Sequence, residues 1–131
     1  MTASRSEDRA AIHELVAAYG DAVSRRDADA WGATWATHAT WSLMGTEVSA
    51  RPAIVALWKA AMAPFEAVSF IACLGPITFD GDCASARCQT QEVLKSADGV
   101  RRVAGIYEDQ FVLEDGRWLF ERREFAILIE H

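Results

Sequence analysis

The chain has 131 residues, of which 51% are hydrophobic and 24% charged, and it carries a formal net charge of −6 at pH 7. This length predicts a single domain with a core of its own, and the composition is typical of a globular protein. The negative charge argues against nucleic acid or an anionic membrane surface as a partner, because both are negatively charged themselves.

Neither end of the chain nor its middle resembles a targeting or anchoring segment. The start, MTASRSEDR, is polar and charged, and the sequence lacks the run of about 18 apolar residues that a membrane span needs. We therefore expect a cytoplasmic protein. Cys73, Cys83 and Cys88 lack metal-ligand spacing, so we expect reduced thiols rather than a disulfide framework or a zinc site. With no Gly-rich nucleotide loop either, no cofactor is expected.

The N-terminal half carries helical periodicity. Ser4 and Glu7 have the spacing of a capping box, and they precede an apolar helix face formed by Ile12, Leu15, Val16, Tyr19 and Val23. Asp27 is suited to cap a second, short helix with Trp31 and Trp35 four residues apart on one face, and ATWSL (39–43) predicts a short strand. A third helix begins near Pro52 and ends near Pro64; its apolar side carries Ile54, Leu57, Trp58, Ala61, Met62 and Phe65.

After residue 66 the period changes to that of strands. Long strands are predicted over roughly 67–80, 83–95, 101–114 and 117–129, separated by the turn sequences DGD, SADG and EDG. Gly75 and Pro76 interrupt the first strand, where a bend would let the sheet curl. Three helices followed by an antiparallel meander predict an α+β fold with the helices on one face of the sheet.

The strand predicted over 101–114 is apolar on both of its faces. One face has Val103, Tyr107 and Phe111, and the other has Ala104, Ile106 and Val112. Since the helices cover only one face of the sheet, the other face needs a partner. We therefore expect a homodimer that associates through the outer face of the sheet.

Four segments of the sequence, taken in this order, resemble the SnoaL-like group of the nuclear-transport-factor-2-like (NTF2-like) superfamily, which has the cystatin-like fold. They are RAAIHELVAAYGDAVSRRDADAWGATWATHATWSL, ARPAIVALW, FDGDCA and GIYEDQFVLEDGRWLFERREF. The resemblance implies a single SnoaL-like domain over residues 1–131, a cone in which a curled antiparallel sheet wraps three helices around a largely apolar pocket. Relatives include ketosteroid isomerase, scytalone dehydratase, polyketide cyclases, a dehydrochlorinase and members that only bind, so the fold alone does not decide the function.

Two branches of this superfamily use an aspartate on the first helix and a histidine at the start of the first long strand, with the histidine removing a proton. The resemblance places these positions at Ser24 and Phe70, so both groups are missing. Asp21, the acid that the first helix does carry there, lies about 180° from the centre of the apolar face, at about 100° per residue. We expect Asp21 to be a solvated surface charge.

Ketosteroid isomerase offers a second template, in which a tyrosine and a protonated aspartate hold an oxyanion while another aspartate acts as base. By resemblance, Tyr19 and Asp109 occupy the two donor positions and Leu43 occupies the position of the base. Arg123 matches a pocket arginine of the dehydrochlorinase branch. If Arg123 lies beside Asp109, the aspartate is ionised and paired, which suits either a structural ion pair or an anchor for a ligand carbonyl or carboxylate.

We therefore expect a cone-shaped pocket for a small hydrophobic molecule, polycyclic or terpenoid-like, with Tyr19, Asp109 and Arg123 as catalytic candidates. The expected ligand-binding residues are Trp35, Trp41, Leu43, Trp58, Met62, Phe65, Phe70, Cys88 and Tyr107. The protein is then either a cofactor-free isomerase, lyase or cyclase, or a non-catalytic binding or assembly module. Glu47 and Glu92 are alternative bases if burial raises the pKa of either one.

Overall fold

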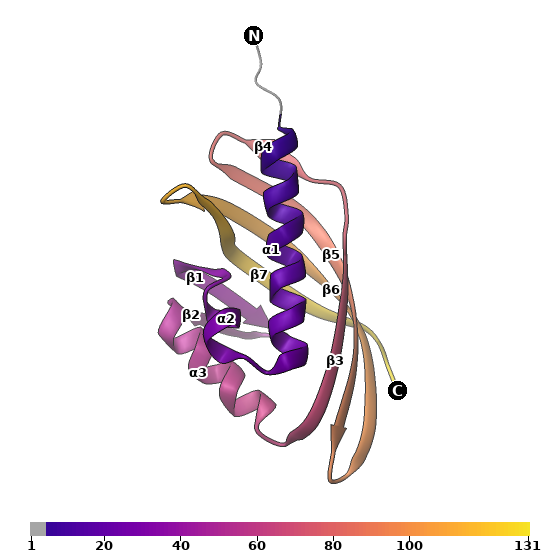
Figure 1. The fold of residues 1–131 in the computed structure, drawn as a ribbon. Helices are drawn as coiled ribbons and strands as arrows, with labels where there is room; N and C mark the ends of the chain where they lie inside the picture. Colours follow the sequence, from indigo (N-terminus) through magenta and orange to yellow (C-terminus); the bar gives the residue numbers. More distant parts are fainter. Residues whose placement is uncertain (1–4) are drawn as a thin grey trace.

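The computed structural model describes residues 5–131, which form three helices and a curled, open sheet of seven strands (Figure 1). The helices are α1 (Ser6–Arg25), α2 (Ala28–Gly32) and α3 (Arg51–Met62). The strands are β1 (Trp35–Leu43), β2 (Thr46–Ser49), β3 (Phe65–Leu74), β4 (Thr78–Asp80), β5 (Cys83–Ser96), β6 (Gly99–Glu114) and β7 (Arg117–Glu130). The predicted α+β class, with three N-terminal helices held in a curled sheet, is confirmed.

Helix α1 buries the apolar face predicted from its periodicity, and Figure 1 shows it lying along the sheet. Ser4 of the expected capping box lies outside the described residues, and the N-cap residue is Arg5, whose side chain makes no capping hydrogen bond. At the other end Arg26 adopts the left-handed conformation, and its guanidinium donates to the backbone carbonyl oxygens of Met62 and Phe65. The end of α1 is thereby tied to the connection between α3 and β3.

The segment after α1 corrects one prediction. Asp27 caps α2 as expected, accepting a hydrogen bond from the backbone N–H of Ala30. Trp35, however, lies in a strand and not on the helix of Trp31, because α2 ends at Gly32 and β1 already begins at Trp35. The helical spacing of the two tryptophans misled the prediction, since both rings reach the same core from different elements, with centroids 5.6 Å apart.

The region around α3 holds two further differences from the sequence-based expectation. Phe65, placed on the apolar side of the third helix, is the first residue of β3. The short hairpin strand β2 was not predicted; it pairs with the end of β1, with Leu43 opposite Thr46. A four-residue strand with mixed polarity leaves no alternating pattern to detect.

The strands follow the order β2-β1-β7-β6-β5-β3, with β4 paired to β5. All neighbouring pairs are antiparallel except β1 and β7, which are parallel. The strand predicted over 67–80 is two strands, β3 and β4, with Gly75 and Pro76 between them. The EDG turn between β6 and β7 has positive φ at Asp115 (51°) and Gly116 (78°), as expected for a hairpin turn that matches strand twist.

The hydrophobic core lies between the helices and the concave side of the sheet. Its fully buried members include Ile12 from α1, Trp31 from α2, Ile54 from α3 and Phe111 from β6. None of the helices in residues 5–131 is long and apolar enough to span a membrane.

Candidate functional site

A cavity of about 260 Å³ opens between the C-terminal half of α1, helix α3 and the inner face of the sheet. Its lining residues come from α1, β1 and the β1–β2 turn, α3, β3, β5, β6 and β7. They are Tyr19, Val23, Trp41, Leu43, Met44, Trp58, Ala61, Met62, Phe65, Phe70, Glu92, Leu94, Arg101, Val103, Tyr107, Phe125 and Ile127. Most are apolar or aromatic, with a few polar groups among them, which is the usual constitution of a small-molecule site.

One wall of the cavity depends on a glycine. A Cβ atom on Gly105 would lie 2.3 Å from the Phe125 ring and 3.1 Å from the Ala126 carbonyl oxygen, so only glycine lets that ring lie against β6. The Phe125 ring also packs on the ring of Tyr107, with centroids 4.8 Å apart. The absence of a side chain at Gly105 therefore allows Phe125 and Tyr107 to pack together on the cavity wall.

Tyr19 is the most enclosed polar residue on the cavity wall. Its side chain is 2% exposed, and its ring lies 5.6 Å from that of Phe70 and 5.3 Å from that of Phe120, centroid to centroid. The Tyr19 hydroxyl lies 3.5 Å from the Tyr107 hydroxyl. Burial is the main cause that raises the pKa of both phenols, so both hydroxyls remain protonated donors.

Behind these two tyrosines lies a buried ion pair. Asp109 and Arg123 are cross-strand partners on β6 and β7, and their side chains are 0% and 1% exposed. The Arg123 guanidinium donates from Nε to Asp109 Oδ1 at 2.7 Å and from Nη2 to Oδ2 at 3.0 Å. This two-point geometry is that of a guanidinium with a carboxylate.

The same guanidinium lies over three aromatic rings. Its Cζ atom is 3.7 Å from the ring centroid of Tyr107, 4.2 Å from that of Phe120 and 4.4 Å from that of Tyr19. Burial lowers the pKa of Arg123, but Asp109 more than offsets this effect, and the net pKa lies above its ordinary value. Burial raises the pKa of the Asp109 carboxyl and Arg123 opposes that rise. The Arg123 guanidinium, with its charge balanced by Asp109, therefore lies directly behind the two tyrosines.

Glu92 is the only carboxylate on the cavity wall in the part of the chain that the structure describes. It lies on β5 directly opposite Phe70 of β3 and Val103 of β6. Burial raises the pKa of Glu92 above its ordinary 4.5, while the positive charges of Arg101 and Arg123 lower it less. Within residues 5–131 its carboxylate has no hydrogen-bond or ion-pair partner.

Ser24 and Phe70, at the positions that the resemblance assigns to the aspartate and histidine, are neighbours in space. The backbone N–H of Phe70 donates to Ser24 Oγ at 3.0 Å. Neither side chain is a proton acceptor of useful strength, and Phe70 contributes an apolar wall instead. Acid–base chemistry at these two positions is therefore absent from this chain.

The expected site residues divide into two groups. Eight of them line the cavity: Tyr19, Trp41, Leu43, Trp58, Met62, Phe65, Phe70 and Tyr107. Trp35, Cys88, Asp109 and Arg123 are buried but do not line it. Trp35 packs against Trp31 and Trp41, and burial raises the pKa of the Cys88 thiol, which lowers the fraction of thiolate that could react.

Two acids considered from the sequence lie on the surface. Asp21 pairs with Arg25 one helical turn away at 2.9 Å, and their side chains are 64% and 55% exposed. Glu47 of β2 is exposed and lies 3.3 Å from the Arg122 guanidinium. Among the described residues, no group of three or more His, Cys, Asp or Glu side chains is arranged to hold a metal ion.

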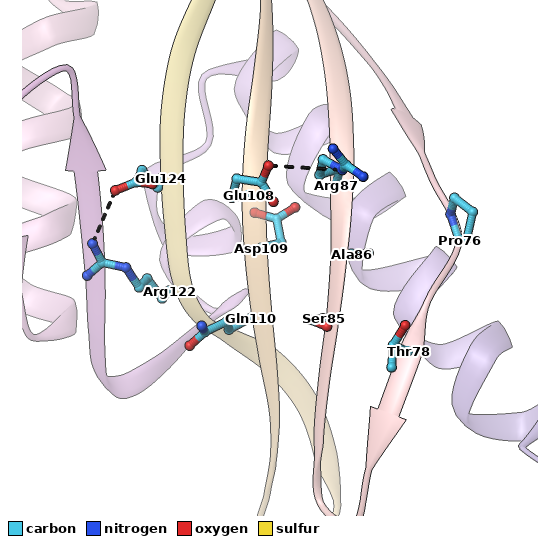
Figure 2. A pocket seen from close by; sticks show the side chains of 10 residues that line it. All are labelled: Pro76, Thr78, Ser85, Ala86, Arg87, Glu108, Asp109, Gln110, Arg122 and Glu124. Atoms are coloured by element: carbon cyan, nitrogen blue, oxygen red, sulfur yellow. Dashed lines mark hydrogen bonds and ion pairs between the residues drawn. The ribbon is translucent and has the colours of Figure 1, made fainter.

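A second hollow, of about 560 Å³, lies on the outer face of the sheet (Figure 2). Charged side chains dominate it: Arg87 lies 4.0 Å from Glu108, and Arg122 lies 3.4 Å from Glu124. These exposed ions are already paired with one another. The outer hollow is therefore poorly suited to a hydrophobic ligand, although it is larger than the inner cavity.

The curled sheet, the three helices on its concave side and the apolar cavity between them define a cone fold of the NTF2-like type. Residues 4–124 match the family model of the SnoaL-like domain, and the chain belongs to this family. Comparison with curated protein sequences gives no match.

Solved structures with the same fold have low sequence identity to this chain. A hexachlorocyclohexane dehydrochlorinase, LinA type 2, has a TM-score of 0.89 at 18% identity, covering 97% of this chain and 89% of that one. A protein of Kribbella flavida has a TM-score of 0.89 at 18% identity, with 98% and 95% covered. A protein of Novosphingobium aromaticivorans, whose name proposes a scytalone dehydratase, has a TM-score of 0.87 at 19% identity, with 95% and 86% covered. At these identities the likeness establishes the fold alone.

Proposed function

We propose that this protein binds a small, flat, hydrophobic molecule bearing a carbonyl or similar acceptor group, and that it acts on it as a cofactor-free isomerase, lyase or cyclase. The ligand lies among Trp41, Trp58, Phe65 and Phe125, and the Tyr19 and Tyr107 hydroxyls donate to its acceptor group. Asp109 and Arg123 support those hydroxyls from behind.

The observation that carries this proposal is the inner cavity, in which apolar walls surround a few polar groups. Its volume of about 260 Å³ lies just below the roughly 300–1,000 Å³ that small-molecule sites span. A ligand of one or two rings, including a terpenoid of that size, therefore suits the cavity better than a larger polycyclic molecule.

A binding module without turnover is the competing function. It is favoured by Ser24 and Phe70, which lack the proton-transfer groups that two branches of the superfamily carry at those positions. Both functions require the same cavity and the same ligand class, so binding is the first property to measure.

The proposed assembly is a homodimer formed through the outer face of the sheet. Ala104, Ile106 and Val112 of β6 are half-buried in the single chain and lie on the strand face opposite Val103 and Tyr107. A partner sheet would remove their remaining apolar surface from water at about 25 cal/mol per Å².

The test of binding starts with a thermal-shift screen of hydrophobic ketones, lactones and epoxides. The protein is then titrated with α-tetralone, a flat bicyclic ketone, and with tetralin, its hydrocarbon counterpart. Binding is measured by tryptophan fluorescence, because Trp41 and Trp58 line the cavity. Saturable quenching by α-tetralone, stronger than that by tetralin, is expected. Absence of any saturable change across the screened compounds would contradict the proposal.

A further inference from the structure

We propose that Glu92 is the general base of the site and that it removes a proton from the carbon next to the ligand carbonyl. This inference rests on the proposed function, because it needs a carbonyl-bearing molecule in the inner cavity. It adds to that function a named proton acceptor and a class of reaction that begins with enolisation.

Glu92 is positioned to act on a ligand in the inner cavity. Glu92 lies on the cavity wall, facing the same space as the Tyr19 and Tyr107 hydroxyls. It is the direct cross-strand neighbour of Phe70, with β3 on one side of it and β6 on the other. A proton acceptor on β5 and two hydroxyl donors on α1 and β6 therefore surround a single apolar space.

The Glu92 carboxylate takes no part in the interactions that hold the described residues together. Across residues 5–131, Asp109 is fully committed to Arg123, and Glu47 lies outside the cavity near Arg122. Glu92 has neither a hydrogen bond nor an ion pair with any of these residues. A half-buried carboxylate without a partner costs stability, so its presence on an apolar wall calls for a role toward a ligand.

The electrostatic surroundings of Glu92 also suit a base. The charged and titratable groups that act on Glu92 are Arg101 and Arg123, which favour its ionised form, and the phenols of Tyr19 and Tyr107. Burial dominates these effects and raises the pKa of Glu92 above its ordinary value. A carboxylate made more basic in this way is a stronger proton acceptor.

The step itself balances without a co-reactant. The C–H bond next to the carbonyl breaks, its proton forms an O–H bond with the Glu92 carboxylate, and the electron pair moves onto the carbonyl oxygen. The Tyr19 and Tyr107 hydroxyls donate to that developing oxyanion, and Arg123 behind them stabilises its charge. Return of the proton to the same carbon gives exchange, return to a different carbon gives isomerisation, and loss of a neighbouring leaving group gives elimination.

The experiment measures exchange of the α-hydrogens of α-tetralone in deuterium oxide by proton NMR, with the full chain and with buffer alone. The wild type is expected to exchange them faster than buffer. Glu92→Gln should lower the protein-dependent rate by about a hundredfold or more, the usual contribution of a positioned base, while the affinity for α-tetralone changes by less than about threefold. Glu47→Gln, a surface control, should exchange at the wild-type rate.

Each outcome has a distinct meaning. If α-tetralone and the other screened compounds do not bind, the proposed function fails. If α-tetralone binds but exchanges at the buffer rate, or if Glu92→Gln retains the wild-type rate, the inference about Glu92 is overturned and the binding function stands. If the variant does not fold, the pH dependence of the wild-type exchange rate tests the inference instead. The protein-dependent rate must rise with pH through a pKa above 4.5, and a profile without that rise overturns the inference.

Discussion

Removing one charge of the buried ion pair is expected to destabilise the protein strongly. Asp109→Asn keeps the size of the side chain but leaves the Arg123 guanidinium buried without its carboxylate. The two side chains are 0% and 1% exposed, so solvent does not screen the loss. Breaking such a pair from one side costs about 3–5 kcal/mol.

This cost is large beside the total stability of a domain, which is about 5–15 kcal/mol. For a chain of this size each kcal/mol lowers Tm by roughly 4 °C, so the expected fall is roughly 12–20 °C. Replacing both partners with apolar residues, as in Asp109→Leu with Arg123→Met, should cost less than Asp109→Asn alone, because no buried charge is left unpaired.

The assay is urea denaturation followed by tryptophan fluorescence, with circular dichroism as a second probe of the same transition. The matched control is Asp21→Asn, which also removes a carboxylate from an arginine, but at a pair that is 64% and 55% exposed. The control should stay within about 0.5 kcal/mol of wild type. If Asp109→Asn also stays within about 1 kcal/mol, the reasoning about the pair is refuted.

Three further predictions concern the site and the assembly. Tyr19→Phe should weaken α-tetralone binding by about 0.5–1.5 kcal/mol in isothermal titration calorimetry and leave tetralin unchanged, because only the ketone accepts the lost hydroxyl hydrogen bond; equal losses for both ligands would speak against a donor role. In sedimentation at tens of micromolar, on the order of assay concentrations for weak interfaces, the wild type should be a dimer and Ile106→Lys a monomer. The helical circular dichroism signal of the variant should be unchanged. A monomeric wild type would rule the interface out. Because burial raises the pKa of Glu92 above 4.5, the folded state holds its proton more tightly than the unfolded state, and stability is lost as pH rises through the folded pKa. Glu92→Gln should therefore have a larger free energy of unfolding in urea than the wild type at neutral pH. This difference should disappear below the ordinary pKa of glutamate, and a difference that grows toward low pH would contradict the prediction.

The parts of the fold that the sequence predicted are those with long periodicity or clear turn sequences. The buried face of α1 repeats its pattern over enough residues for a helix to be recognised, and the long strands β5, β6 and β7 are separated by the turn sequences DGD, SADG and EDG. Trp35 was misplaced because two tryptophans four residues apart fit a helix as well as a strand entering the same core. The four-residue strand β2 was missed because so short a segment has no period.

The candidate site was predictable only in part. The sequence offered Glu92 as an alternative base, and the structure places Glu92 on the cavity wall. Leu94 lies two residues further along β5 and also lines the cavity, whereas Phe125 and Arg101 reach it because the sheet curls and because Gly105 leaves room for the Phe125 ring. The sequence predicted a bend at Gly75 and Pro76, but not which side chains the curled sheet brings to the cavity. An Asp109–Arg123 pair entered the sequence-based expectation only as a condition, and the structure shows the two side chains in contact. Their place behind the cavity wall follows from the packing of Tyr19, Tyr107 and Phe120 around the guanidinium.

The most direct test of the central claim, that the inner cavity binds the ligand, is to fill the cavity at its helical wall. Ala60 and Ala61 of α3 are both exposed to solvent, but only Ala61 lines the cavity. Isothermal titration calorimetry with α-tetralone should show binding to wild type and to Ala60→Phe with similar affinity, and a loss of at least about tenfold for Ala61→Phe. Equal affinity for all three proteins would place the ligand elsewhere and contradict the account.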